Sequence, residues 1–273
     1  MQTEKRDRRF RRVAILGAGV MGSGIAAHMA GAGLDVLLLD IVPPDLKEGD
    51  PKASDPKARN KFALGALDKL KTSKPAALFH PRDLERIRVG NLTDDLAAAG
   101  ACDLIIEAVR EDIEVKRALY ARLEPLLGPD TIVASNTSGL PIKKLMEGRG
   151  ESMRRRFLVT HFFNPVRYMR LLELVAGDET DPAVLADLAR FGETGLGKGI
   201  VFGHDTVNFV ANRIGVLGMM GLIDMAVKGG YTIEEIDAIF GPPLGRPKSA
   251  VFRTADMVGL DTVIDVAENC YHN

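Results

Sequence analysis

Apolar residues in the first half of the chain fall into short β-branched or leucine-rich runs, and stretches with helical spacing lie between these runs. In the helical stretch 113–127, for example, four leucines fall on one face. Such an alternation is typical of a parallel sheet wound with helices. We therefore predict an α/β fold with a doubly wound sheet, and its predicted strands are residues 13–16, 36–39, 104–109, 131–135 and 157–163.

The pattern changes after residue 204, where the strands stop and a long apolar helix begins. Its apolar stretch, residues 209–227, is interrupted by Asn212, Arg213 and Asp224. Such residues are costly at the centre of a bilayer. We therefore predict a buried helix of a soluble protein and not a membrane span.

Two domains are expected, a sheet domain over residues 1–203 and a smaller all-helical domain over residues 204–273. The helical domain contains a capping box, in which Thr232 and Glu235 satisfy backbone donors ahead of an apolar run. The chain ends directly after a helical pattern that starts at Asp261, without a glycine to close it. The helical domain is therefore expected to be incomplete.

Composition argues against several classes of function. The 36 basic and 37 acidic residues nearly cancel, so no whole-chain field attracts nucleic acid or an anionic membrane. The basic run 5–12 has no apolar segment behind it and is interpreted as a solvated arm, not as a secretory signal. Cys102 and Cys270 lack the spacing of a zinc site or a redox pair, so no metal site is expected. These features favour reduced thiols and a cytoplasmic location.

The glycine-rich segment GAGVMG follows the first predicted strand and opens the next helix. Gly17 permits a tight turn, Gly19 lets the backbone approach a pyrophosphate, and Gly22 permits close packing of the helix. The N-terminus of that helix supplies amide donors and positive potential to a phosphate. Such a triplet alone also occurs in structural turns. In this strand, turn and helix context it predicts a Rossmann-type dinucleotide site.

Asp40 ends the second predicted strand, where its carboxylate can accept hydrogen bonds from the ribose hydroxyls of an adenosine. The carboxylate would repel a 2′-phosphate, and no arginine follows directly to bind one. These features favour NAD over NADP. The alternative interpretation of Asp40 is an ordinary turn residue at a strand end.

Further polar residues follow the later strands, at the edge where open α/β sheets bind ligands. They are Glu111 and Lys116 after LIIEAV, Ser138 in SNTSG, and His161 with Asn164 in HFFNP. Each taken singly has a structural explanation, as a solvated helical turn, a helix cap or a core histidine. Taken together they predict one site at this edge.

The dipeptide Asn164-Pro165 can turn the chain so that RLLELV returns beside RFLVTHFF, with Glu173 facing His161. A carboxylate that holds a histidine fixes the imidazole tautomer and stabilises the imidazolium that forms when a hydroxyl proton is removed. This pairing makes His161 the candidate general base. A surface charge on a strand is the alternative for Glu173.

In the helical domain, the segment DTVNFVANRI places Asn212 on an otherwise apolar helix. A polar amide in that setting needs a hydrogen-bond partner. A substrate oxygen and the nearby backbone both remain open as that partner.

At these residues the sequence resembles the 3-hydroxyacyl-CoA dehydrogenase family, from Val13 to the end of the chain. The resemblance is carried, in the family's order and approximate spacing, by GAGVMGSGIA, IIEAVREDIEVK, ASNTSGLPI, HFFNPVRYMRLLE, DTVNFVANRI and VGLDT. The length before IIEAV and the segment from GGYTIEEIDAIF to VGLDT look like a long bacterial multifunctional subfamily, in which an enoyl-CoA hydratase domain follows the dehydrogenase. The resemblance thus implies the dehydrogenase part of such a protein, C-terminally truncated.

This resemblance implies NAD-dependent oxidation of L-3-hydroxyacyl-CoA to 3-ketoacyl-CoA in fatty-acid β-oxidation, by a homodimer and without a metal. His161 would be the base and Glu173 its partner, and the reacting part of the substrate would be bound by Ser138 and Asn212. The positions that match cofactor contacts, beside the three glycines, are Asp40, Glu111, Lys116, Ser138 and Asn164.

The sequence departs from the family pattern in three places. Gly139 replaces a frequent second serine, TVNF replaces the usual TPGF, and the family's terminal glycine-rich segment is missing. The first two departures should leave the chemistry intact, whereas the third would leave the cofactor site and the second domain incomplete. The family's CoA-contacting serine and lysine fall near Ala66 and Ser73, so that role is not transferred. The candidates for phosphate contact are Lys69, Lys71 and Lys74.

Two other functions stay open at this point. A dehydrogenase of a free 3-hydroxyacid would share the glycine loop, but it would normally carry a lysine base where this sequence has HFFNP and Glu173. A non-catalytic NAD-binding structural protein would keep the fold without turnover. Against it stand the intact His161, Glu173, Ser138 and Asn212.

Overall fold

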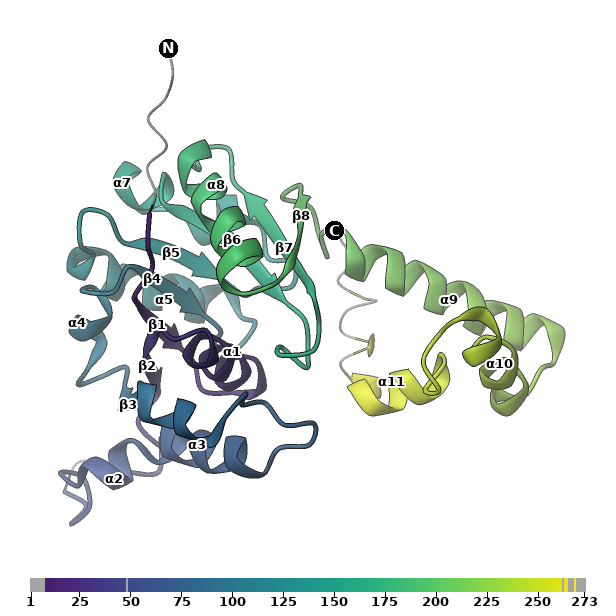
Figure 1. Cartoon of the computed structure of the whole chain (residues 1–273), viewed down its shortest axis with the longest axis horizontal. Coiled ribbons are helices and arrows are strands. Elements are labelled where there is room, and N and C mark those ends of the chain that lie inside the picture. The colour runs from purple at the N-terminus through teal and green to yellow at the C-terminus, as the bar shows by residue number, and fades with distance from the viewer. Residues whose placement is uncertain (1–7, 48, 262, 265–267, 269–273) are drawn as a thin grey trace. The chain divides into compact units, whose positions relative to one another are not determined.

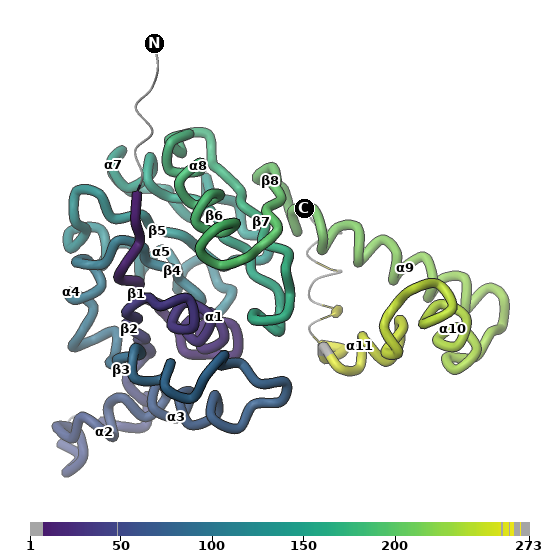
Figure 2. Tube along the Cα trace, viewed as in Figure 1, coloured from purple at the N-terminus to yellow at the C-terminus, as the bar shows by residue number. Residues whose placement is uncertain are grey.

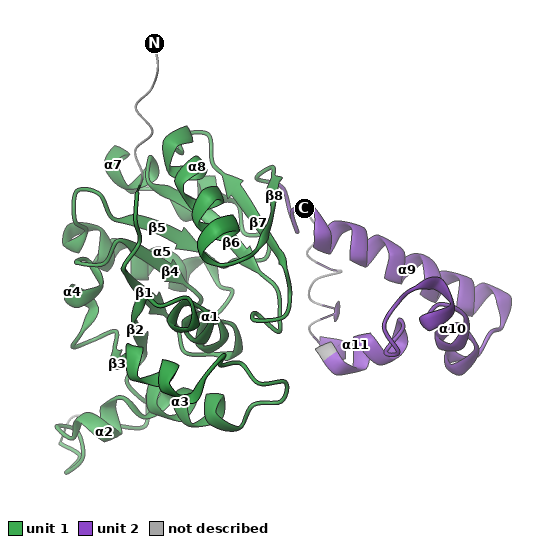
Figure 3. Cartoon of the chain, viewed as in Figure 1, with its two compact units in different colours: residues 1–205 green, residues 206–273 purple. Residues whose placement is uncertain are grey.

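The computed structural model describes residues 8–47, 49–261, 263–264 and 268 of the chain. The chain divides into two compact units, residues 1–205 and residues 206–273 (Figure 3). This division lies close to the boundary expected between residues 203 and 204.

The first unit is built around an eight-stranded sheet (Figure 1). Its order is β3-β2-β1-β4-β5-β6-β7-β8, and neighbouring strands are parallel except for the antiparallel pair β6 and β7. The strands are β1 (Arg12–Leu16), β2 (Asp35–Asp40), β3 (Ile87–Asn91), β4 (Leu104–Glu107), β5 (Ile132–Ser135), β6 (Phe157–Phe162), β7 (Leu171–Ala176) and β8 (Gly199–Gly203). The order reverses between β1 and β4, the kind of switch point at which doubly wound sheets bind ligands. The predicted Rossmann-type sheet is confirmed.

The central strands are apolar because helices cover both faces of such a sheet. Every residue of β4, β5 and β6 is buried. Helix α1 packs on β2 and lies beside α3, as the chain trace shows (Figure 2). The helices of this unit are α1 (Val20–Gly31), α2 (Pro56–Arg59), α3 (Lys61–Thr72), α4 (Leu96–Ala99), α5 (Ile113–Leu123), α6 (Ile142–Leu145), α7 (Glu151–Arg154) and α8 (Pro182–Arg190).

The described part of the second unit is helical, as expected, with α9 (Ala211–Gly229), α10 (Ile233–Ile239) and α11 (Phe252–Val258). The predicted capping box opens α10: the Thr232 hydroxyl accepts from the Glu235 N–H at 3.2 Å, and the Glu235 carboxylate accepts from the Thr232 N–H at 2.9 Å. None of the helices in the described residues combines the length and apolarity needed to cross a bilayer. Cys270 and part of the helix expected from Asp261 lie outside the described residues.

The predicted helix over residues 113–127 ends early. Helix α5 ends at Leu123, and a 3₁₀ turn over Glu124–Leu126 follows it. Pro125 explains the change, since it has no N–H to donate to the preceding turn and restricts the residue before it.

The basic run near the N-terminus also differs from the expected solvated arm where it is described. Phe10 is buried, and its ring centroid lies 4.7 Å from that of Phe191. The backbone N–H groups of Arg11 and Arg12 both donate to the Asp103 carboxylate. These residues therefore lead into the sheet, because an apolar ring anchors them.

Candidate active site

The glycine loop joins β1 to α1 and depends on contacts that only glycine permits. Gly17 has a φ of +104°, and a Cβ there would lie 2.5 Å from the carbonyl oxygen of Ala108. A Cβ on Gly22 would lie 1.9 Å from the carbonyl oxygen of Gly17, so the helix packs tightly on the turn. A Cβ on Gly19 would meet nothing within 4 Å, and no described side chain caps α1. The first-turn N–H groups can therefore receive a pyrophosphate.

The Asp40 carboxylate forms the strand-end contacts of a turn residue, and it also lies where a ribose could reach it. Its carboxylate accepts the N–H of Ala18 at 2.7 Å and the N–H of Ile41 at 2.6 Å. The first bond ties the glycine loop to the end of β2. Each carboxylate oxygen keeps a further lone pair, and Asp40 lines a cavity of this unit. It can thus hold the loop and still accept hydrogen bonds from ribose hydroxyls.

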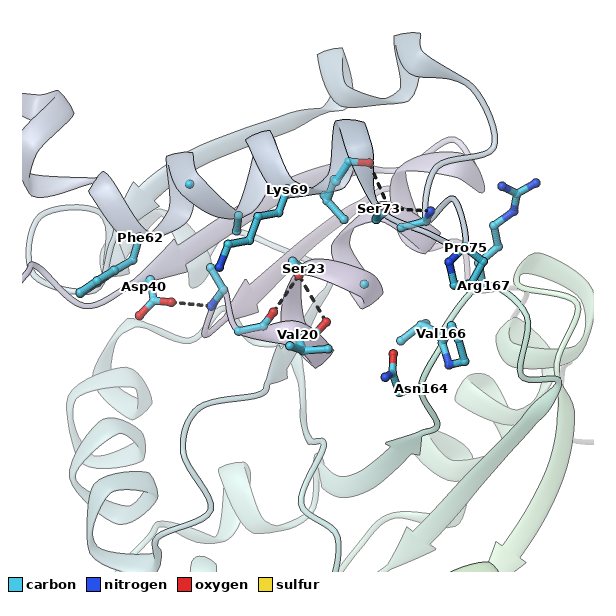
Figure 4. A pocket seen from close by; sticks show the side chains of 18 of the residues that line it. Val20, Ser23, Asp40, Phe62, Lys69, Ser73, Pro75, Asn164, Val166 and Arg167 are labelled. Atoms are coloured by element: carbon cyan, nitrogen blue, oxygen red, sulfur yellow. Dashed lines mark hydrogen bonds between the residues drawn. The ribbon is translucent and has the colours of Figure 1, made fainter. Parts of the chain in front are cut away.

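This cavity has a volume of about 850 Å³ and borders the N-terminal end of α1 (Figure 4). Asp40 and Phe62 lie at one end of it, and Asn164, Val166 and Arg167 lie at the other. A cavity with these dimensions and with glycine-loop backbone in its wall accommodates a nucleotide.

Basic side chains also reach the cavity. Two of the lysines considered for phosphate contact, Lys69 and Lys74, line it. The third, Lys71, forms an ion pair with Asp68 at 2.7 Å and is not among the lining residues. Lys69 and Lys74 therefore remain as the candidates for phosphate contact.

Glu107, at the end of β4, is a fully buried carboxylate that sequence reasoning missed. Lys116 Nζ donates to its Oε1 at 2.7 Å, and the hydroxyls of Tyr120 and Ser135 donate to its Oε2 at 2.6 and 2.7 Å. Burial first, and then the Glu107 charge, raise the pKa of Tyr120 well above its usual value, so the phenol remains a donor. The available signal was a glutamate inside an apolar strand, followed by Lys116 and Tyr120 four residues apart on one helix face.

Glu111 extends this network to the segment SNTSG. Its Oε2 lies 3.2 Å from Lys116 Nζ, and its Oε1 accepts from the Ser138 N–H at 2.8 Å and from the Thr137 hydroxyl. The Lys116 side chain is only 1% exposed, whereas that of Glu111 is 41% exposed. Lys116 therefore holds Glu111, and Glu111 in turn holds the loop that carries Ser138.

His161 and Glu173 face each other across the antiparallel pair β6 and β7. His161 Nδ1 lies 2.7 Å from Glu173 Oε2, and both residues are buried. The pairing predicted from the Asn164-Pro165 turn is thus present. Because a carboxylate only accepts hydrogen bonds, Nδ1 donates its proton to Glu173, and in the neutral form of the ring the lone pair is then on Nε2. Asn136 secures the same strand, since its Oδ1 accepts from the Phe162 N–H at 2.9 Å.

The first unit carries every predicted site residue except Asn212. Asn164 is exposed in the turn after β6 and lines the cavity. Asn212 lies in the first turn of α9, in the second unit, where it is half-buried. Among the described residues, no group of three His, Cys, Asp or Glu side chains is arranged to hold a metal ion. The side chains of the first unit can therefore hold a dinucleotide and accept a proton at a histidine nitrogen.

Comparison with known families agrees with this geometry. Residues 12–206 match the family model described as "3-hydroxyacyl-CoA dehydrogenase, NAD binding domain". Residues 209–273 match the model described as "3-hydroxyacyl-CoA dehydrogenase, C-terminal domain". The two matches together cover most of the chain, and the first identifies the dinucleotide as NAD.

Individual proteins show the same likeness. The chain is 47% identical over 213 residues to a probable 3-hydroxyacyl-CoA dehydrogenase of Bacillus subtilis. The matched region covers 78% of this chain and 27% of that protein. The chain is 39% identical over 204 residues to a putative fatty acid oxidation complex trifunctional enzyme of Rickettsia felis, covering 75% of this chain and 28% of the relative. The chain thus spans about a quarter of the length of these two relatives.

A solved structure extends the comparison to both units. The crystal structure of FadB2 from Mycobacterium tuberculosis matches with a TM-score of 0.77 and 33% sequence identity. The match covers 97% of this chain and 88% of that one.

Proposed function

Because the chain belongs to the 3-hydroxyacyl-CoA dehydrogenase family, we propose that it oxidises L-3-hydroxyacyl-CoA to 3-ketoacyl-CoA as a step of fatty-acid β-oxidation. The observation that carries this proposal is the buried pair of His161 Nδ1 and Glu173 Oε2, 2.7 Å apart, in the same unit as the NAD-binding loop. A histidine held in this way is suited to remove a hydroxyl proton.

The residues of the first unit fit NAD. The open backbone at Gly19 and the uncapped start of α1 receive the pyrophosphate, and Asp40 receives the adenosine ribose. We assign Glu111 and Asn164 to the remainder of the cofactor; Asn164 lines the cavity, and Lys116 would act through Glu111, to which its ammonium is paired. Bound NAD⁺ supplies the hydride acceptor for the carbon that carries the hydroxyl.

His161 Nε2 takes the hydroxyl proton of the substrate as that carbon is oxidised. The imidazole becomes an imidazolium, and the Glu173 carboxylate stabilises the new charge through Nδ1–H. The pair therefore acts as a unit. Burial strengthens the effect, because few water molecules compete with the carboxylate in a low-dielectric site.

Ser138 and Asn212 complete the proposal as hydrogen-bond donors to the substrate oxygens. Ser138 is held by the bond of its backbone N–H to Glu111, which fixes the loop before substrate arrives. Lys69 and Lys74, in the wall of the cavity, are proposed to meet phosphate groups of CoA. The proposal also includes a homodimer and, on the likeness to a relative named as a trifunctional enzyme, an enoyl-CoA hydratase domain in the parent protein.

The test is NADH formation by the purified full-length protein with the two enantiomers of 3-hydroxybutyryl-CoA and with free 3-hydroxybutyrate. We expect absorbance of NADH to rise with the L-thioester only. Turnover of the free acid at a comparable kcat/KM would instead favour a hydroxyacid dehydrogenase. Binding of NADH without turnover of any of the three would remove the proposed activity while leaving the NAD site intact.

A further inference from the structure

One buried ammonium holds the turn that connects β6 to β7. Lys198 is only 6% exposed, and its Nζ donates to the carbonyl oxygens of Val166 at 2.5 Å and Met169 at 2.8 Å. No described carboxylate forms an ion pair with it. A buried lysine that has only neutral acceptors is uncommon, since burying a charge without a counterion costs free energy.

The segment that carries Lys198 is also fixed to α1. His28, on that helix, donates from Nε2 to the carbonyl oxygen of Leu196 at 3.1 Å. Burial, and then the positive charges of Lys198 and Arg167, lower the pKa of His28 to about 4, so this ring is neutral at physiological pH. The segment 196–198 is therefore tied to α1 by a neutral histidine and to the turn by a charged lysine.

The turn held by Lys198 forms one wall of the nucleotide cavity. Asn164, Val166 and Arg167 line that wall, and Val166 packs against α1 so closely that a Cβ on Gly24 would lie 3.1 Å from its Cγ2. Arg167 fixes the far side of the turn, because its guanidinium donates to the carbonyl oxygens of Ala76 and Leu78 at 3.0 and 2.5 Å.

We propose that Lys198 is a positioning residue for the cavity: it holds the turn at residues 164–169 against α1 and thereby sets the affinity for the nucleotide. The inference rests on the proposed function only where kcat is measured, because NADH binding can be measured without turnover. The His161–Glu173 pair depends less on Lys198, because the β6–β7 ladder holds it through its own backbone hydrogen bonds. Loss of the ammonium should therefore affect nucleotide binding much more than kcat.

The charge itself provides a second readout. Burial lowers the pKa of Lys198 to about 8, so the ammonium loses its proton in a mildly alkaline solution. An amine is a weaker donor to the two carbonyls than an ammonium. The titratable groups near Lys198 are His28 on α1, which lies close enough for the Lys198 charge to lower its pKa, and Arg167 in the turn that Lys198 holds. His28, whose pKa is lowered to about 4, stays neutral in this range and does not titrate together with Lys198.

The experiment measures the dissociation constant of NADH by fluorescence for the wild type, Lys198→Met, Lys198→Arg and the control Lys57→Met, which removes an exposed ammonium on α2. At about pH 7, Lys198→Met should weaken NADH binding about tenfold, and Lys57→Met should not. The kcat of Lys198→Met, where turnover is measurable, should stay within about threefold of the wild type. Unchanged NADH affinity in folded Lys198→Met would overturn the proposal.

The pH series separates positioning from mere stability. Between about pH 7 and about pH 9.5 the wild type should bind NADH progressively more weakly, by about threefold to tenfold, whereas Lys198→Arg should show a flat profile. If the dissociation constant of NADH increased with pH in Lys198→Arg as much as in the wild type, the inference would be contradicted. If circular dichroism shows that neither variant folds, the wild-type series still decides, since a constant affinity across this range would also overturn it.

Discussion

Glu173→Gln removes the charge of the partner carboxylate and nearly preserves its shape. Glu173 is fully buried, and the substitution leaves no cavity because the two side chains have similar volumes. The amide oxygen of glutamine can still accept the proton on His161 Nδ1. It cannot stabilise the imidazolium that forms in the reaction, so the effect should fall on kcat.

The magnitude follows from the geometry of the pair. A hydrogen bond to a charged group contributes about 1.5–3 kcal/mol, and a short, buried contact lies toward the upper end of that range. The 2.7 Å separation of Nδ1 and Oε2 in a buried site is of this kind. Since about 1.4 kcal/mol corresponds to a factor of ten in rate, kcat should fall by about tenfold to about 150-fold.

Steady-state rates of NADH formation test this expectation, with Glu179→Gln as the matched control. Glu179 is 52% exposed and pairs with Arg154 at 2.8 Å, and its substitution should leave kcat unchanged. The KM for NAD should change little in either variant, because neither residue lines the nucleotide cavity. A Glu173→Gln enzyme with kcat within about twofold of the wild type would refute the reasoning.

Two further substitutions test the cofactor site and the pH dependence of stability. Asp40→Ala should reduce the ratio of NADH affinity to NADPH affinity by about tenfold, since it removes the charge that repels a 2′-phosphate. Titrations in which the wild type and Asp40→Ala have the same ratio would contradict this expectation. The pKa of His28 is about 4 in the folded protein against an ordinary value of 6.5, so the unfolded state binds more protons between these values and stability falls as the pH falls through this window. His28→Gln has no such titrating group, so its free energy of unfolding should fall less on acidification than that of the wild type, by about 3 kcal/mol over the window. Urea unfolding of the wild type and of His28→Gln at about pH 7 and about pH 4 measures this difference. If the two proteins lost the same stability on acidification, the assignment to His28 would be wrong.

The parts of the fold that the sequence did not predict have physical reasons. The missed strands β3 and β8 are the two edges of the sheet. An edge strand is partly exposed and so lacks the continuous apolar run that identifies a central strand, as the mostly unburied residues of β8 illustrate.

The candidate site was predictable where a short connection or a strand end fixed the geometry. One turn after Asn164 brings Glu173 back to His161, so the register could be foreseen. Glu107 was different. Its partners Lys116, Tyr120 and Ser135 come from two other elements, and only the packing of α5 against the sheet brings them to one carboxylate.

The measurement that tests the central claim most directly is the pair of kcat and NADH affinity for His161→Ala. His161 meets the reacting hydroxyl in the proposed mechanism, whereas the glycine loop and Asp40 hold the nucleotide. The kcat for L-3-hydroxybutyryl-CoA should therefore fall by about 10²–10⁴, the usual contribution of a positioned general base, while the dissociation constant of NADH stays within about twofold. A kcat near that of the wild type, with NADH binding intact, would contradict the assignment of His161 as the base.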